Sequence, residues 1–221
     1  MSQPRSALSV LLDLLGDELR DVIDIGCGAG ALEAPLTHAG KRWQGIDPQP
    51  APAAGPSRRQ GRAESLPWPD DSFDAAIFVN SLHHVPPAAM ADALREAARV
   101  TRPHGCVIVV EPKAHGDLSQ VIAVVDDETA IRTAARDAVR TSDALTLIDT
   151  FGYDRIERFA AFDAFLASLT AADPARAERA RRRGADLRAR FDRLGHEGPG
   201  GIGLDQPMEV HVLAPASGPT P

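Results

Sequence analysis

A short apolar strand runs directly into a glycine-rich loop, and this junction constrains the fold more than any other feature. The strand is predicted over residues 21–25, the loop reads Gly26-Cys27-Gly28-Ala29-Gly30, and a helix is predicted over residues 31–39. Glycines let the backbone approach a ligand without interference from a Cβ atom. The helix start behind them presents unpaired N–H groups at the positive end of its dipole. The junction therefore predicts a ligand site at the carboxyl end of a strand.

Strands and helices alternate through the first half of the chain. Further strands are predicted over residues 42–46, 57–60, 73–79 and 107–110, and a helix is predicted over residues 86–100. This order predicts a doubly wound α/β fold, in which a mostly parallel sheet has helices on both faces.

The second half carries more helix than such a sheet requires. Strands are predicted over residues 153–159 and 208–213, which brings the sheet to seven, and the last strand is expected to be antiparallel. We expect a single domain over residues 1–221. Within it, we expect two helical insertions, residues 113–150 and residues 160–207, which cover the substrate as a lid. We expect a disordered tail over residues 214–221.

The overall charge limits the classes of partner. The formal net charge is −7, which argues against nucleic acid or an anionic membrane, because both need a basic surface. No apolar run approaches the ~20 residues that span a bilayer, and Asp13, Asp17 and Glu18 interrupt the N-terminal segment as no signal peptide would allow. The two cysteines exclude a disulfide framework and a cysteine zinc site. We expect a cytoplasmic monomer or homodimer that takes a small-molecule substrate and holds no metal.

Asp47 follows the second predicted strand, next to the glycine loop in a sheet of this kind. A carboxylate at this position accepts hydrogen bonds from ribose hydroxyls, so the pattern indicates a cofactor that contains a nucleoside. Gly26-x-Gly28-x-x-Ala31 also satisfies the dinucleotide fingerprint. The sequence therefore also fits an NAD(P)-dependent Rossmann oxidoreductase, beside enzymes that use another nucleoside cofactor.

The motifs resemble those of class I S-adenosylmethionine-dependent methyltransferases, in the small stand-alone type-11 branch that includes quinone-biosynthesis and natural-product enzymes. Val22–Gly30 resembles motif I, and the resemblance continues in the family's order through Gly45–Asp47, Ala63–Pro67, Asp71–Ala76, Ser81–Val85, Arg102–Gly105 and Glu111-Pro112. It implies a Rossmann-like sheet and covers about the first half of the chain. Pro103-His104-Gly105 departs from the usual Pro-Gly-Gly, and the second half, where a substrate would be recognised, matches no family motif.

The resemblance also implies a cofactor and its contacts. The cofactor would be S-adenosylmethionine, with S-adenosylhomocysteine as the product, and the protein would methylate a small-molecule acceptor. The implied contacts are Gly26, Cys27 and Gly28 with the methionine part, Asp24 and Asn80 with its amino group, Asp47 with the ribose, and Ala63 and Glu64 with the adenine. A non-catalytic partner module that keeps this fold is a further alternative.

Methyl transfer is an in-line displacement, so most of its acceleration can come from alignment in a dry site. A general base is needed only where the acceptor carries a proton. His84 and His83 follow the 73–79 strand and have a suitable pKa range, whereas packing and capping are the alternative roles. Glu111 ends the 107–110 strand, where it would contact the substrate or bind loop backbone.

Overall fold

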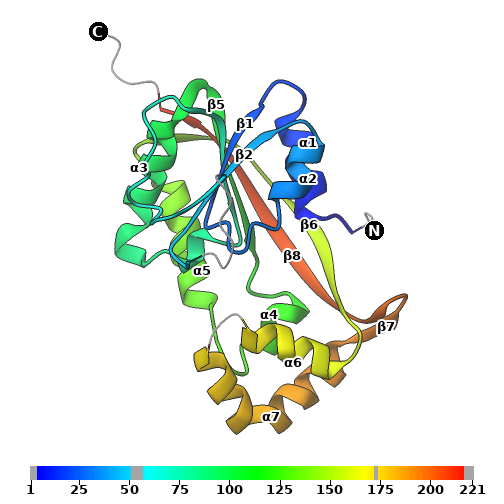
Figure 1. Ribbon diagram of the computed structural model, residues 1–221. Coiled ribbons are helices and arrows are strands. Elements are labelled where there is room, and N and C mark those ends of the chain that lie inside the picture. The colour runs from blue at the N-terminus through cyan, green and yellow to red at the C-terminus, as the bar shows by residue number, and fades with distance from the viewer. Residues whose placement is uncertain (1–3, 51–56, 172–173, 217–221) are drawn as a thin grey trace. The chain divides into compact units, whose positions relative to one another are not determined.

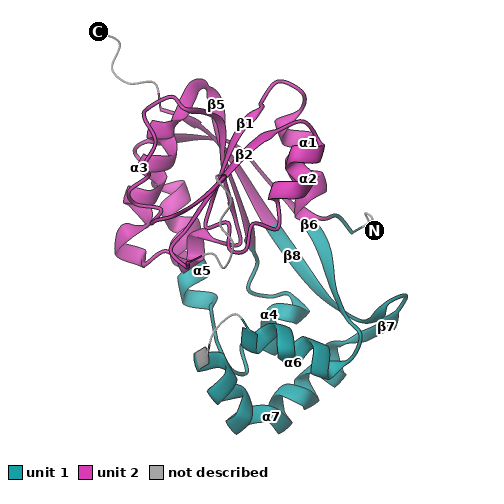
Figure 2. Ribbon diagram, in the orientation of Figure 1, with its two compact units in different colours: residues 1–5, 112–132, 153–208 teal, residues 6–111, 133–152, 209–221 magenta. Residues whose placement is uncertain are grey.

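The computed structural model describes residues 4–50, 57–171 and 174–216 (Figure 1). The chain divides into two compact units (Figure 2). Unit 1 consists of residues 1–5, 112–132 and 153–208, and unit 2 consists of residues 6–111, 133–152 and 209–221.

Unit 2 is built on a mostly parallel sheet. Its first strands are β1 (Asp21–Ile25), β2 (Arg42–Asp47), β3 (Arg58–Gln60), β4 (Phe73–Val79) and β5 (Thr101–Pro112). The pairs β1–β2, β1–β4, β2–β3 and β4–β5 are all parallel. The complete strand order is β3-β2-β1-β4-β5-β8-β6, which confirms the predicted α/β class and the path of seven strands.

Two long strands complete this path and continue into unit 1. They are β6 (Leu145–Phe159) and β8 (Gly201–Pro215). A short strand, β7 (His196–Gly198), lies off the main path and pairs antiparallel with β8. Among the described residues, the sheet therefore has one strand more than the seven predicted, because the glycine-rich segment 195–201, which the sequence predicts to be a loop, contains β7.

The central strands are apolar on both faces, as expected for a sheet that is covered by helices on both sides. Residues 22–25 and 75–78 are buried, and so are the consecutive residues 107–110. Helices α1 (Ala7–Leu15) and α2 (Glu33–His38) lie on one side of the sheet and α3 (Met90–Val100) on the other (Figure 1). Part of α5 (Thr129–Arg140) also belongs to this unit.

Several predicted boundaries are wrong for local reasons. The leucine spacing predicts a helix over residues 6–19, with Gly16 as a possible end; α1 does end at Leu15, because Gly16 follows with a positive φ of 50°. The second helix begins at Glu33, because the glycine loop continues in turns up to that point. Strands β5, β6 and β8 are all longer than predicted, since the residues added at their ends lack the continuous apolar run that marks a buried strand.

Unit 1 is mainly helical. It contains α4 (Asp117–Ile122), α6 (Phe162–Ala171) and α7 (Pro174–Leu194). Helix α4 is not predicted from the sequence because, at six residues, it is too short to show a helical period. Phe165 and Phe191 lie at the centre of its core with ring centroids 5.2 Å apart. Of the first expected insertion, residues 113–132 belong to unit 1 and residues 133–150 to unit 2. β8 continues to Pro215, and residues 217–221 of the expected tail lie outside the described residues.

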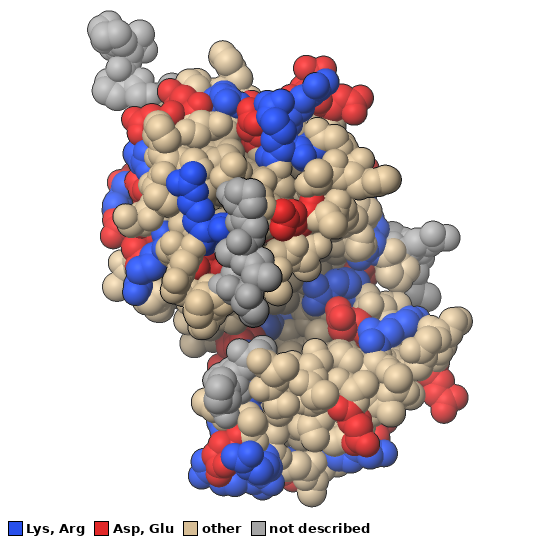
Figure 3. Space-filling view, in the orientation of Figure 1, with Lys and Arg blue, Asp and Glu red and all other residues tan. Residues whose placement is uncertain are grey.

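The arginine run 181–183 lies on α7 and is exposed, as a solvated helix face would be. Arg181 and Arg182 pair with Glu178, and Arg183 pairs with Asp186. Figure 3 shows basic and acidic side chains next to one another on this part of the surface. In the described ranges, we find no helix with both the length and the apolar character needed to cross a membrane.

Substitution of Gly45 by alanine is expected to destabilise unit 2. A Cβ atom at this position would lie 2.7 Å from the Cys27 Sγ atom and closer still to the Trp43 indole, and overpacking of this kind typically costs about 1–3 kcal/mol. Gly184→Ala is the matched control, because no heavy atom lies within 4 Å of the added methyl group. Denaturant unfolding of both variants tests this, and equal stability of Gly45→Ala and wild type would contradict the packing at β2.

Candidate functional site

The glycine loop at residues 26–30 is fastened to the neighbouring strand ends through its backbone. The amides of Gly26 and Cys27 both donate to the Ile46 carbonyl oxygen, at 2.8 and 3.1 Å. Gly26 has a φ of 78°, and a Cβ atom there would lie 2.5 Å from the Ser81 Cβ atom. Ser81 in turn donates its hydroxyl to the Ile25 carbonyl oxygen at 2.6 Å. The loop is thus held at the carboxyl ends of β1, β2 and β4, where open α/β sheets bind ligands.

Asp47 ends β2 and lies against the glycine loop. Its Oδ2 atom accepts a hydrogen bond from the Gly28 amide at 2.8 Å, and its Oδ1 atom accepts one from the Gln49 amide at 2.9 Å. The carboxylate is mostly buried. Each carboxylate oxygen has a second lone pair, so Asp47 can hold the loop and still accept from a hydroxyl group.

Asp24 lies within β1 and is 3% exposed. The Trp43 indole N–H donates to its Oδ2 atom at 3.3 Å. Burial raises the pKa of Asp24 to about 7, and the negative charge of Asp47 adds to this rise, while the Trp43 hydrogen bond opposes it. A cation bound beside Asp24 would favour its ionised form.

Asn80 follows β4 and carries two signs of a binding position. Its φ is 53°, a left-handed conformation that non-glycine residues seldom adopt. Its Oδ1 atom is buried without a hydrogen-bond partner, although its backbone amide donates to the Val110 carbonyl oxygen at 2.9 Å. Buried polar atoms are normally paired, so this acceptor fits a ligand that brings its own N–H or O–H group.

The remaining expected cofactor contacts are Cys27, Ala63 and Glu64. Cys27 is buried, and burial raises its thiol pKa to about 11, so it is not a nucleophile at neutral pH. Ala63 and Glu64 lie half-buried in the turn that follows β3. The Glu64 carboxylate pairs with Arg62 at 2.5 Å.

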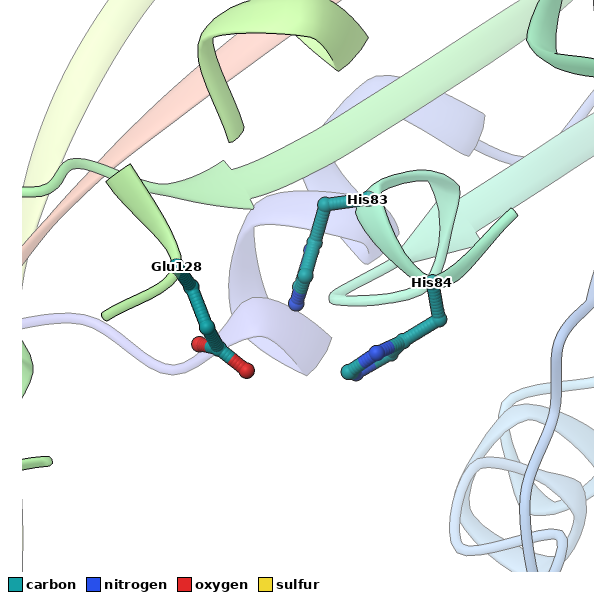
Figure 4. A group of neighbouring side chains, drawn as sticks. All are labelled: His83, His84 and Glu128. Carbon is teal, nitrogen blue, oxygen red and sulfur yellow. The ribbon is translucent and has the colours of Figure 1, made fainter. Parts of the chain in front are cut away.

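The expected catalytic residues separate into a buried pair and an exposed histidine. The Glu111 Oε1 atom accepts hydrogen bonds from the amides of Leu82 and His83, at 2.9 and 3.3 Å, and its Oε2 atom contacts His83 Nδ1. Glu111 therefore fastens the short 3-10 turn η1 (Leu82–His84) to the end of β5. His83 is 3% exposed, whereas His84 is exposed, and the two ring centroids are 4.1 Å apart (Figure 4).

This geometry makes His84 the more accessible of the three candidates. The Glu111 carboxylate accepts from two backbone amides and contacts the His83 ring. Glu111 and His83 therefore orient the turn from which His84 projects. The Glu111–His83 contact was not expected from the sequence. Its only signal was that His83 and Glu111 each follow or end a predicted strand of the same parallel sheet, where the carboxyl ends of strands share one edge.

Two supporting residues were also missed. Ser81 packs against Gly26, and Trp43 donates to Asp24. A single serine such as Ser81 gives no recognisable pattern in a sequence. Trp43 lies in an apolar strand, where its role as a hydrogen-bond donor cannot be distinguished from packing.

Comparison with known proteins matches residues 23–109 to the methyltransferase domain family. The ubiquinone biosynthesis O-methyltransferase of Azorhizobium caulinodans is 31% identical over 136 residues, which cover 57% of this chain and 53% of that protein. An uncharacterized methyltransferase of Mycolicibacterium paratuberculosis is 38% identical over 101 residues, covering 41% of this chain and 38% of that protein. The chain thus spans about half the length of the first relative and less of the second.

A solved structure shows the same fold over almost the whole chain. The YcgJ protein of Bacillus subtilis aligns with a TM-score of 0.58 and 20% identity, over 96% of this chain and 98% of that protein's chain.

Asp24 is expected to make stability depend on pH. An aspartate in an unfolded chain titrates near pH 3.9, whereas the folded pKa is about 7. Between these values the folded protein binds more protons, so the free energy of unfolding falls as the pH rises from about 4 to about 7. The slope is at most about 1.4 kcal/mol per pH unit, and it vanishes above pH 7.

Urea unfolding at several pH values tests this expectation. Asp24→Asn should remove the contribution of Asp24 to this slope, while Asp92→Asn, an exposed position on α3, should keep it. A wild-type-minus-variant difference that does not change with pH would contradict the assignment.

Proposed function

We propose that the protein transfers a methyl group from S-adenosylmethionine to a small-molecule acceptor, because residues 23–109 match the methyltransferase domain family and the motifs resemble those of class I S-adenosylmethionine-dependent methyltransferases of the type-11 branch. The observation that carries the proposal is the unpartnered Asn80 Oδ1 atom at the carboxyl end of β4. The next residue, Ser81, packs against Gly26 of the glycine loop. A hydrogen-bond acceptor that lacks a partner therefore adjoins the loop that would hold the cofactor.

The residues present suit the chemical groups of this cofactor. Asn80 Oδ1 and the Asp24 carboxyl group can accept from an ammonium group, and the free lone pairs of Asp47 can accept from ribose hydroxyls. Ala63 and Glu64 are the proposed adenine contacts. When bound, S-adenosylmethionine supplies an electrophilic methyl group on a positively charged sulfur.

The chain's own groups would protect and assist the transfer. The raised pKa of Cys27 keeps the thiol protonated at neutral pH, so it does not compete with the acceptor. Where the acceptor carries a proton, an imidazole nitrogen of His84 is the proposed base, and Glu111 and His83 are proposed to hold its turn in place.

The acceptor is proposed to be a small molecule because the net charge is −7 and aromatic residues make up only 5% of the chain, which suits nucleic acid poorly. We propose that acceptor recognition lies in residues 113–150 and 160–207. A cytoplasmic location and a monomeric or homodimeric state belong to the same proposal.

Calorimetry with S-adenosylhomocysteine and with NAD(H) and NADP(H) tests the cofactor assignment. We expect binding of the first compound only, and we expect Asp47→Ala to weaken it by roughly 1–3 kcal/mol through loss of buried hydrogen bonds. Because this variant also loses the bonds to the Gly28 and Gln49 amides, its unfolding is measured in parallel. Asp92→Ala is the control, and binding of a nicotinamide cofactor alone would reverse the proposal.

Asn80→Gly separates the side chain of Asn80 from its backbone conformation. Glycine adopts a positive φ without strain, so this variant should keep its stability and lose about tenfold in S-adenosylhomocysteine affinity, equivalent to about 1.4 kcal/mol. Asn80→Ala should lose similar affinity and also about 1–2 kcal/mol of stability from the left-handed backbone. Unchanged affinity in both variants would remove Asn80 from the site.

A further inference from the structure

The loop that carries the proposed adenine contacts is hydrogen-bonded to Arg99 on α3. We call residues 63–70 the base loop. The Arg99 NH1 group donates to the Trp68 carbonyl oxygen at 2.9 Å and to Asp70 Oδ1 at 2.8 Å, and its NH2 group donates to the Leu66 carbonyl oxygen at 3.1 Å.

Glu96, one turn earlier on α3, completes this attachment. It accepts from Arg99 Nε at 2.7 Å and from Arg99 NH2 at 2.8 Å. The Glu96 Oε2 atom also accepts from the Leu66 amide at 2.8 Å. All five N–H groups that a guanidinium can offer therefore have a partner. The Arg99 hydrogen bond lowers the pKa of Glu96, which keeps the pair charged.

The base loop has little else to position it. Pro67 and Pro69 have no amide hydrogen, and apart from the short Arg62–Ser65 bridge the loop belongs to no strand. Its remaining attachments are the buried Leu66 side chain, a hydrogen bond from the Ser72 hydroxyl to the Pro69 carbonyl oxygen at 2.7 Å, and contacts of Trp68. Trp68 meets Phe73 edge-on at 5.6 Å and lies under the Arg59 guanidinium at 4.7 Å. Arg59 also donates to the Pro67 carbonyl oxygen at 3.3 Å.

We propose that Arg99 is a positioning residue for base recognition: by fixing the base loop, it determines how the protein distinguishes adenine from other bases, without contacting the cofactor. The inference rests on the proposed function, in which Ala63 and Glu64 meet the adenine. Two backbone carbonyl groups and one carboxylate of the base loop accept hydrogen bonds from the planar guanidinium of Arg99. Lysine has only three donors on a flexible stem and cannot reproduce this arrangement.

The test compares S-adenosylhomocysteine with S-inosylhomocysteine. Hypoxanthine replaces the exocyclic amino group of adenine by an oxygen and so reverses the donor and acceptor order at that edge. We expect wild type to prefer the adenine compound at least tenfold, since a mispaired buried polar group is costly. In Arg99→Lys the ratio of the two dissociation constants should fall at least threefold toward one, whereas a general loosening would weaken both compounds equally and leave the ratio unchanged.

Arg95→Lys is the matched control, because Arg95 lies on the same helix and pairs with Asp92 and Asp143 instead of the base loop. If Arg99→Lys does not fold, the same ratio of dissociation constants is measured for Glu96→Gln. This variant keeps an acceptor for the Leu66 amide but loses the charged pair with Arg99. A wild-type ratio near one, or an unchanged ratio in the folded variant, overturns this inference while leaving the proposed function in place. A wild-type protein that binds neither compound overturns the proposed function itself.

Discussion

The attachment of the glycine loop to the end of β2 is the interaction on which the candidate site depends. Two loop amides share the Ile46 carbonyl oxygen, and a third donates to the Asp47 carboxylate. These bonds require the left-handed conformation of Gly26 and the absence of its Cβ atom. Because β1 and β2 pair in register up to Ile25 and Ile46, the sheet itself brings the donors and acceptors together. The site is therefore a consequence of strand register.

Two polar residues near this attachment, Asp24 and Asn80, are in unfavourable environments. Asp24 is buried with a pKa near 7, and Asn80 combines a left-handed backbone with an unpaired side-chain oxygen. Each arrangement destabilises the ligand-free protein. A cationic ligand that pairs with the Asp24 carboxylate and donates an N–H hydrogen bond to Asn80 Oδ1 would relieve both costs at once, which is why the two residues support one ligand hypothesis.

The sequence predicts the parts of this structure that repeat a pattern. The buried strands and the glycine loop are visible because apolar runs and glycines leave a local mark, and β4 was placed correctly at both ends. β6 was predicted only over its second part, because it lies at the end of the sheet order and its first residues are mostly exposed. Contacts such as Glu111 with His83 join residues far apart in the chain, and no single-sequence pattern reports them.

Cofactor recognition and acceptor recognition differ in how a sequence can encode them. The residues matched to the methyltransferase family, 23–109, all belong to unit 2, where a few strand ends suffice to meet a constant ligand. An acceptor varies from one enzyme to another, so its contacts follow no shared spacing. Unit 1 is held by an aromatic core around Phe165 and Phe191, which constrains packing and leaves surface side chains free to vary. Chemical identification of the proposed acceptor therefore has to start from binding and turnover, with the proposed cofactor site as its reference.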